Sequence, residues 1–338
     1  MIVRFANRIG RRELIGLMAG IFALPVAARG QEATDRTRRL SVLSVTSADD
    51  PIAQARTAVL NDTLAALDWR EGVNLRVDWR NGNGDRARIS DFAAELVALE
   101  PDVILAVGTP CVAELKRRTA TIPIVFAIVT DPVGQGLVAS LSQPGGNITG
   151  FTDYDGPMAG KWLEMLTQIT PRVARAAVLY NPATAPFAGL MLRAIENAAS
   201  SLSITVRAAP VDDKTDLKRA IGALAAEKNT GLLVLPDFFT LANREPIVRS
   251  TASAAVPAVY WSRAFVADGG LMSYSTDTAD LLRRAALYVD RILKGAQASA
   301  LPVQNPTKFD LTVNLKTAAS LGVTLSPSLL AIANEVIE

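Results

Sequence analysis

The chain repeats one local pattern, a short apolar run that ends in a polar loop and is followed by a segment with helical spacing of apolar residues. Such runs occupy residues 40–45, 103–107 and 124–129 in the first half and residues 176–180, 231–235 and 256–260 in the second. Strands that are apolar throughout are buried on both faces, which is typical of parallel sheets covered by helices. The pattern therefore predicts an α/β protein.

The same β/α rhythm starts twice, and the restart near residue 153 divides the chain into two halves. We expect two doubly wound, Rossmann-like lobes, each with a central parallel sheet. The C-terminal part departs from the rhythm and is expected to serve both halves, so that several crossovers form a hinge. The predicted boundaries are residues 39–152 plus 276–300 for the N-terminal lobe and residues 153–275 plus 301–338 for the C-terminal lobe.

Residues 1–30 have the three parts of an export signal peptide. Arginines precede an uncharged run, Leu14–Ala28, which ends in small residues where a signal peptidase could cut. A transmembrane helix needs about 20 apolar residues, so this shorter run favours a removed leader over a retained anchor. The pair Arg11-Arg12 resembles a twin-arginine signal, but Gly10 and Leu14 depart from that pattern, so Sec export stays open. The expected location of the protein is the periplasm.

The inventory of reactive side chains excludes most catalytic and metal centres. The chain has no histidine and a single cysteine, Cys111. Ser-His and Cys-His nucleophile pairs, zinc sites built on histidine or paired thiolates, and disulfides within the chain are therefore excluded. A hydrolase that works through two carboxylates needs them placed across a cleft, and no such pair is identifiable. We therefore expect a binding protein that is not an enzyme and has no cofactor and no metal ion.

The charge balance gives no reason to expect a nucleic-acid partner. Residues 1–30 hold five of the 35 basic residues and one of the 33 acidic ones, which leaves 30 basic and 32 acidic residues in the rest. Binding to nucleic acid depends on a positive surface that neutralises phosphates. With 49% hydrophobic and 20% charged residues, the chain is expected to be globular and long enough for two domains that each bury a hydrophobic core. A monomer is the expected oligomeric state.

A set of short segments, in this order, resembles the ABC-transporter substrate-binding proteins of the tryptophan/tyrosine-uptake type. The segments are Val107–Pro110, Thr130–Val133, Thr149–Phe151, Gly269–Tyr274, Tyr288–Gly295 and Pro306–Phe309. The resemblance covers essentially the whole chain after the leader. It implies a type I periplasmic binding protein fold with two α/β lobes, three crossovers and a ligand in the cleft.

Ligands of open parallel sheets bind beyond the carboxyl ends of the strands, where loops and helix N-termini meet. Five expected strand ends therefore supply candidate ligand-binding residues, namely Thr46 with Ser47, Gly108 with Thr109, Thr130 with Asp131, Asn181, and Asp237. Thr109 could cap a helix whose amide groups face an anion, or could act as a cap alone. Asp131 and Asp237 could pair with a ligand ammonium group, although an aspartate beside a proline also initiates turns without any ligand.

Three aromatic residues complete the candidate set. Phe151 lies at an expected crossover, and Tyr260 and Tyr274 lie near expected strand ends of the second half. An aromatic side chain that stacks on a planar ligand group contributes about 0.5–1.5 kcal/mol beyond the burial of its area. Packing in the core or the hinge is the competing interpretation for each of them.

These observations lead to one main hypothesis and one alternative. We expect the periplasmic solute-binding component of an ABC importer, which captures a small polar solute by lobe closure and presents it to permease subunits in the inner membrane. An amino acid is the expected solute, and an aromatic one is an option. The alternative is an exported ligand-sensing receptor subunit for a kinase or chemoreceptor, which the sequence does not separate from a transport protein.

Overall fold

The described residues, 36–170 and 172–338 of this computed structural model, form two separate β-sheets. The signal peptide expected at residues 1–30 lies outside the described residues. In the first sheet all strands are parallel, in the order β2-β1-β3-β4-β5. They are β1 (Arg38–Ser44), β2 (Leu75–Asn81), β3 (Val103–Val107), β4 (Ile124–Val129) and β5 (Ile148–Thr152).

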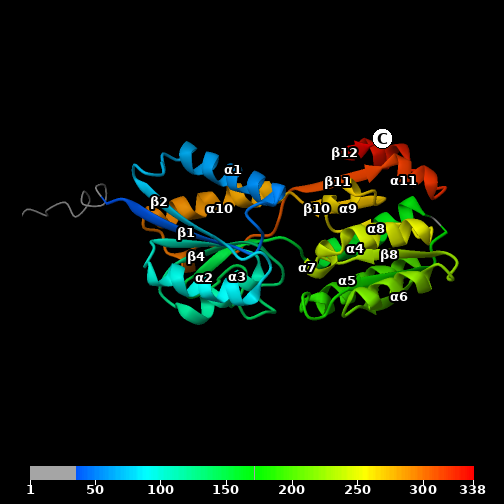
Figure 1. Ribbon diagram of the computed structural model, residues 1–338, viewed down its shortest axis with the longest axis horizontal. Helices are drawn as coiled ribbons and strands as arrows, with labels where there is room; N and C mark the ends of the chain where they lie inside the picture. Colours follow the sequence, from blue (N-terminus) through cyan, green and yellow to red (C-terminus); the bar gives the residue numbers. More distant parts are fainter. Residues whose placement is uncertain (1–35, 171) are drawn as a thin grey trace, which may run out of the picture. The chain divides into compact units, whose positions relative to one another are not determined.

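Helices cover both faces of the first sheet, as the continuous apolar strands predict. Helices α1 (Pro51–Ala66) and α10 (Thr278–Leu293) pack on each other and on one face, and α2 (Arg86–Ala98) and α3 (Thr109–Arg118) cover the other face (Figure 1). Every residue of β3 is buried, because both faces of this central strand meet a hydrophobic core. We call this sheet and its four helices the first lobe.

The second sheet has seven strands in the order β12-β11-β10-β9-β8-β6-β7. They are β6 (Arg175–Tyr180), β7 (Thr205–Pro210), β8 (Thr230–Val234), β9 (Ala258–Tyr260), β10 (Met272–Thr276), β11 (Phe309–Asn314) and β12 (Glu335–Ile337). Strand β11 runs antiparallel to β10, unlike the parallel pairs beside it. The chain leaves β10 for α10 of the first lobe and comes back into β11 from the same end of the sheet, which reverses its direction.

Two hydrophobic cores flank the second sheet, which with its helices forms the second lobe. Helices α4 (Gly156–Ile169) and α5 (Ala188–Leu202) contribute to one core, which also includes residues of α11 (Leu315–Ser320) and α12 (Pro327–Ala331). Helices α6 (Lys214–Leu224), α8 (Arg244–Ser253) and α9 (Arg263–Ala267) contribute to the other. The short helix α7 (Phe238–Ala242) follows β8, and a 3-10 turn, η1 (Ala298–Ala300), follows α10.

The chain passes three times between the elements of the two sheets. The passages follow β5, follow β10, and precede β11. Hydrogen bonds join the three passages to one another. The Thr276 hydroxyl donates to the Asp153 carbonyl, and the Thr152 hydroxyl donates to Asn305 Oδ1 at 2.9 Å. The Asp277 N–H donates to the Lys308 carbonyl at 3.1 Å. The two-lobe α/β fold that the sequence predicts is thus confirmed, whereas the residue boundaries of the lobes stay a prediction.

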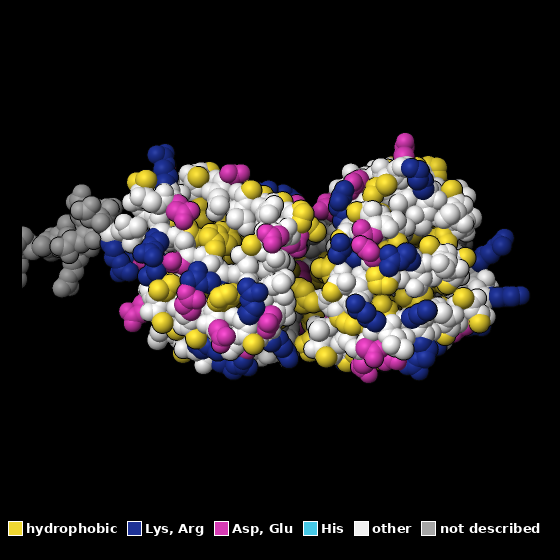
Figure 2. Space-filling model, in the orientation of Figure 1, with side chains coloured by type: hydrophobic (Ala, Val, Ile, Leu, Met, Phe, Trp, Pro, Cys, Tyr) yellow, Lys and Arg dark blue, Asp and Glu magenta, His cyan; other side chains and the backbone are white. Residues whose placement is uncertain are grey.

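Charged side chains of both signs are interspersed on the face that Figure 2 shows. This mixture agrees with the near balance of basic and acidic residues in the sequence. In the part of the chain that the structure describes, no helix combines the length and the apolar character that crossing a bilayer requires.

Candidate functional site

Each sheet has one point at which the strand order reverses. In the first sheet β1 lies between β2 and β3, and in the second β6 lies between β7 and β8. Helices that leave two adjacent strands on opposite faces open a crevice at the carboxyl ends of those strands, and ligands of open α/β sheets bind there. The structure therefore directs attention to the ends of β1 and β3 in the first lobe and of β6 and β8 in the second.

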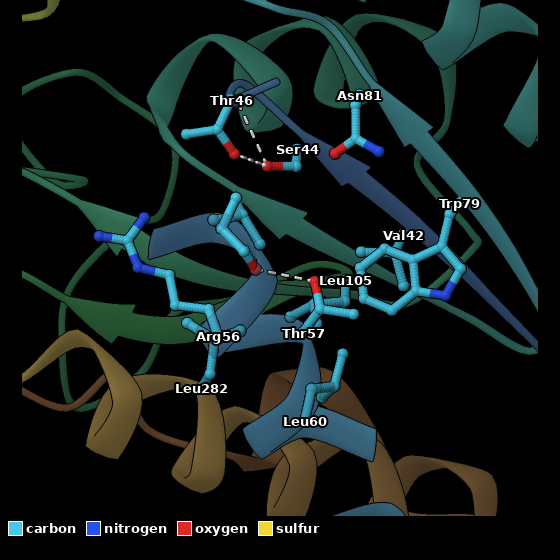
Figure 3. A pocket seen from close by; sticks show the side chains of 12 residues that line it. Val42, Ser44, Thr46, Arg56, Thr57, Leu60, Trp79, Asn81, Leu105 and Leu282 are labelled. Atoms are coloured by element: carbon cyan, nitrogen blue, oxygen red, sulfur yellow. Dashed lines mark hydrogen bonds between the residues drawn. The ribbon is translucent and has the colours of Figure 1, made fainter. Parts of the chain in front are cut away.

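A pocket opens beside the reversal point of the first sheet (Figure 3). It is formed by the last residues of three strands, the first turns of α1 and one residue of α10. The lining residues are Val42, Ser44, Thr46, Ala53, Arg56, Thr57, Leu60, Trp79, Asn81, Leu105, Val107 and Leu282. Its floor is apolar, and hydroxyl, amide and guanidinium groups surround it, a composition that suits a small polar solute.

The polar groups of the pocket are positioned by local structure. The hydroxyl groups of Ser44 and Thr46 lie 2.8 Å apart and share a hydrogen bond, and the Thr57 hydroxyl donates to the Ala53 carbonyl at 2.9 Å. Helix α1 starts here because the Asp50 side chain accepts a hydrogen bond from the Ile52 N–H. In Figure 3 the Arg56 guanidinium and the Trp79 indole lie at opposite ends of the group of lining side chains.

The candidates at the ends of β1 and β3 lie close to this pocket or in it. Thr46 lines it, whereas Ser47 is half-buried and its hydroxyl accepts a hydrogen bond from the Asp49 N–H at 3.4 Å. Gly108 precedes α3 with a φ of 96°, and a Cβ atom there would lie 2.8 Å from Cγ1 of Val45. Glycine is therefore needed at this turn for steric reasons alone. Thr109 is the first residue of α3 and is half-buried.

Thr130 and Asp131, after β4, have different surroundings. The buried Thr130 hydroxyl donates to Asp153 Oδ1 at 2.7 Å, and Asp131 is half-buried and accepts the Gly134 N–H at 2.9 Å. Burial raises the pKa of Asp153 from 3.8 to about 6, although hydrogen bonds from Thr130 and from the Tyr154 N–H act in the opposite direction. Thr130 thus contacts the passage that follows β5. Its partner there, Asp153, was not among the candidate residues that the sequence supplied.

Asn181 and Asp237 lie together at the reversal point of the second sheet. Asp237 Oδ2 accepts the Asn181 N–H at 2.8 Å, and Oδ1 accepts the Phe239 N–H at 2.8 Å as well as the Thr184 hydroxyl. Burial raises the pKa of Asp237, whereas these hydrogen bonds stabilise its charged form. Both carboxylate oxygens are already engaged by the protein, so Asp237 has a structural role at the start of α7.

The three aromatic candidates contact protein groups. The centre of the Phe151 ring lies 4.6 Å from the centre of the Tyr288 ring and 4.8 Å from the guanidinium carbon of Arg284. The buried Tyr260 stacks on Phe265 at 4.8 Å and shares a 2.9 Å hydrogen bond with Thr251. Tyr274 is half-buried and stacks on Phe309 at 5.5 Å. These contacts account for the three rings as packing residues, and a role in ligand binding stays a prediction.

Sequence reasoning missed four polar residues of the pocket, Ser44, Arg56, Thr57 and Asn81. Asn81 is the last residue of β2, so it lies at a strand end of the kind that supplied the other candidates, but this strand is not among the apolar runs that the sequence analysis used. Arg56 lies in the second turn of α1, where that rule does not look. Within residues 36–170 and 172–338, no group of three carboxylate or thiol side chains is placed to hold a metal ion.

Comparison with known proteins identifies the family of the chain. Over residues 43–337 the sequence matches the family described as ABC transporter substrate binding protein. A tyrosine-binding protein from Clostridioides difficile (strain R20291) is 26% identical over 254 residues, which cover 75% of this chain and 72% of that relative.

Two solved structures have the same fold. A conserved domain protein from Vibrio cholerae is 31% identical with a TM-score of 0.80, and the match covers 89% of this chain and 100% of that one. An ABC domain from Streptococcus pneumoniae in complex with L-Trp is 26% identical with a TM-score of 0.80 and the same coverage of both chains. The resemblance that the sequence motifs indicate is thereby confirmed, and the chain belongs to the ABC transporter substrate-binding proteins, which carry a solute and are not enzymes.

Proposed function

We propose that this protein captures an amino acid, preferentially an aromatic one, and delivers it to the permease of an ABC importer. The observation that carries the proposal is the pocket at the reversal point of the first sheet, where hydroxyl, amide and guanidinium groups surround an apolar floor. Two relatives support the class of solute, since one is a tyrosine-binding protein and the other was solved with L-Trp. Polar groups beside an apolar surface are the kind of lining that binding of an amino acid with a large apolar side chain requires.

Capture by lobe closure is the second part of the proposal. A ligand shifts a protein toward a closed state only through contacts that are better in that state, so both lobes must contribute to binding. The three passages of the chain between the two sheets support a hinge, because a few residues at element ends can absorb the change in backbone angles. In the second lobe, the loops that follow β6 and β8 would face the solute, and Asp237 would hold these loops together through its hydrogen bonds to Asn181 and Phe239.

The proposed place of action is outside the cytoplasmic membrane, and the expected signal peptide at residues 1–30 supports it. Cell fractionation and N-terminal sequencing of the exported protein test this point. A mature protein that begins after residue 28 and lies in the periplasmic fraction is expected. A full-length chain in the cytosol would refute the location.

Calorimetric titration of the purified protein with L-tyrosine, L-tryptophan and a set of non-aromatic amino acids tests the choice of solute. Any solute that purifies with the protein is first removed by partial unfolding and refolding. We expect binding of one molecule per chain for at least one aromatic amino acid. Absence of heat for all amino acids, from a protein whose circular dichroism shows that it is folded, would refute the proposal.

A further inference from the structure

Arg56 is a half-buried cation in the pocket, and one end of its guanidinium group has no partner among the residues that the structure describes. The Nε atom donates to the Thr278 hydroxyl at 3.0 Å. Among the residues that the structure describes, no acceptor or carboxylate is paired with either terminal nitrogen of Arg56. The bond to Thr278 fixes the orientation of the group and leaves the two terminal nitrogens available to a ligand.

The two carboxylates whose charges act on Arg56 are those of Asp50 and Asp153, and both accept hydrogen bonds from other groups. Asp50 caps the N-terminus of α1, and Asp153 accepts hydrogen bonds from Thr130 and from the Tyr154 N–H. Burial lowers the pKa of Arg56, while Asp50 and Asp153 act in the opposite direction. An arginine nevertheless keeps its proton in proteins. A half-buried charge without a partner is unfavourable, so a bound anion would improve the energy of this site.

Comparison with the other half-buried arginines shows how unusual the unpaired terminal nitrogens of Arg56 are. Arg38, Arg39, Arg80, Arg118 and Arg244 each form an ion pair with a carboxylate. Arg284 is half-buried too and donates to the Asn305 carbonyl and the Gln304 side chain. Within residues 36–170 and 172–338, Arg56 is the one half-buried arginine whose terminal nitrogens have no acceptor.

We propose that the terminal nitrogens of Arg56 bind the carboxylate group of the solute, and that this contact restricts the protein to solutes with a free carboxylate. The planar guanidinium group matches a carboxylate with two parallel hydrogen bonds. The hydroxyl groups of Ser44 and Thr46 and the amide of Asn81 line the same pocket and provide neutral donors. The inference rests on the proposed function and goes beyond it by naming the group of the solute that is recognised and the residue that recognises it.

The test compares L-tyrosine with L-tyrosinamide, in which a neutral amide replaces the carboxylate. Calorimetry is performed on the wild-type protein, on Arg56→Met, which keeps the length of the side chain without its charge, and on Arg56→Lys, which keeps the charge without the planar fork. We expect the wild type to prefer tyrosine over tyrosinamide by about 30-fold or more, as for a desolvated charge pair. Arg56→Met should lose this preference by binding tyrosine more weakly, and Arg56→Lys should lose part of it.

The matched control is Arg117→Met, which removes an exposed arginine of α3 that pairs with Glu114 on the same helix. Its affinity for both compounds should equal that of the wild type. The inference fails if Arg56→Met binds tyrosine like the wild type, or if it loses tyrosine and tyrosinamide by the same factor, which would indicate a structural role. A wild type that binds both compounds equally would also overturn it while leaving the proposed function intact. A wild type that binds neither tyrosine nor any other amino acid would overturn both.

Discussion

The buried carboxyl group of Asp153 should give the protein a pH-dependent stability that one substitution removes. Its side chain is 6% exposed, and its Oδ1 atom accepts hydrogen bonds from the Thr130 hydroxyl at 2.7 Å and the Tyr154 N–H at 2.8 Å. Because both bonds end on one oxygen, the variant Asp153→Asn can keep them while it carries no charge. The substitution therefore changes the titration of this position more than its packing.

The sign and the size of the effect follow from the pKa. Burial raises the pKa of Asp153 from 3.8 to about 6 in the folded protein. Between these two values the folded state holds a proton that the unfolded state has lost, so this group stabilises the fold at low pH and the benefit is lost as the pH rises toward 6. A shift of about two pH units corresponds to about 3 kcal/mol in the free energy of unfolding.

Urea denaturation followed by circular dichroism, at constant ionic strength from about pH 4 to about pH 7, measures this contribution. The stability of Asp153→Asn relative to the wild type should rise by about 2–3 kcal/mol over that range. Thr130→Val is the companion variant, and loss of its hydrogen bond to the carboxylate should extend the transition to higher pH. A stability difference between Asp153→Asn and the wild type that stays constant over the range would refute the reasoning.

Two further predictions concern the backbone of the first lobe and the second reversal point. Gly150→Ala places a Cβ atom 2.1 Å from the Phe126 carbonyl oxygen at a φ of 153°, and it should reduce the free energy of unfolding by about 2–5 kcal/mol. The control is Gly136→Ala, at a φ of 64° with open space around the new atom, which should lower the free energy of unfolding by only about 1 kcal/mol in urea denaturation. Equal decreases in the two variants would mean that the contact with Phe126 does not matter. Asp237→Ala removes the acceptor of the Asn181 and Phe239 N–H groups and should lower stability by about 2–4 kcal/mol in the same assay. Unchanged stability together with lost solute binding would instead assign Asp237 to the solute alone.

The sequence predicted the central strands best. The predicted strands at 103–107 and 124–129 agree at both ends with β3 and β4, because continuous apolar runs identify strands that are buried on both faces. Helix α8 was not anticipated from the sequence. Among its first six residues only Ile247 and Val248 have apolar side chains that are typical of a core. Helix α4 begins at Gly156 because Asp155 caps it and Pro157 fits the first turn of a helix.

The functional site could be predicted only in part, for physical reasons. The strand-end rule located Thr46 in the pocket, since that rule depends on chain direction alone. It could not show that Asp237 is engaged by Asn181 and Phe239, because those contacts depend on how β6 and α7 meet. The orientation of Arg56 could not be predicted, because it depends on a hydrogen bond to the Thr278 hydroxyl, which is 222 positions away in the sequence.

The central claim is that a solute is held at the carboxyl ends of strands from both lobes. Hydrogen–deuterium exchange of the purified protein, with and without the amino acid that binds in calorimetry, tests this claim most directly. We expect slower exchange around residues 44–57 at the first reversal point and around residues 181–184 and 237–243 at the second. Protection confined to one lobe, or located away from the strand ends, would contradict the account.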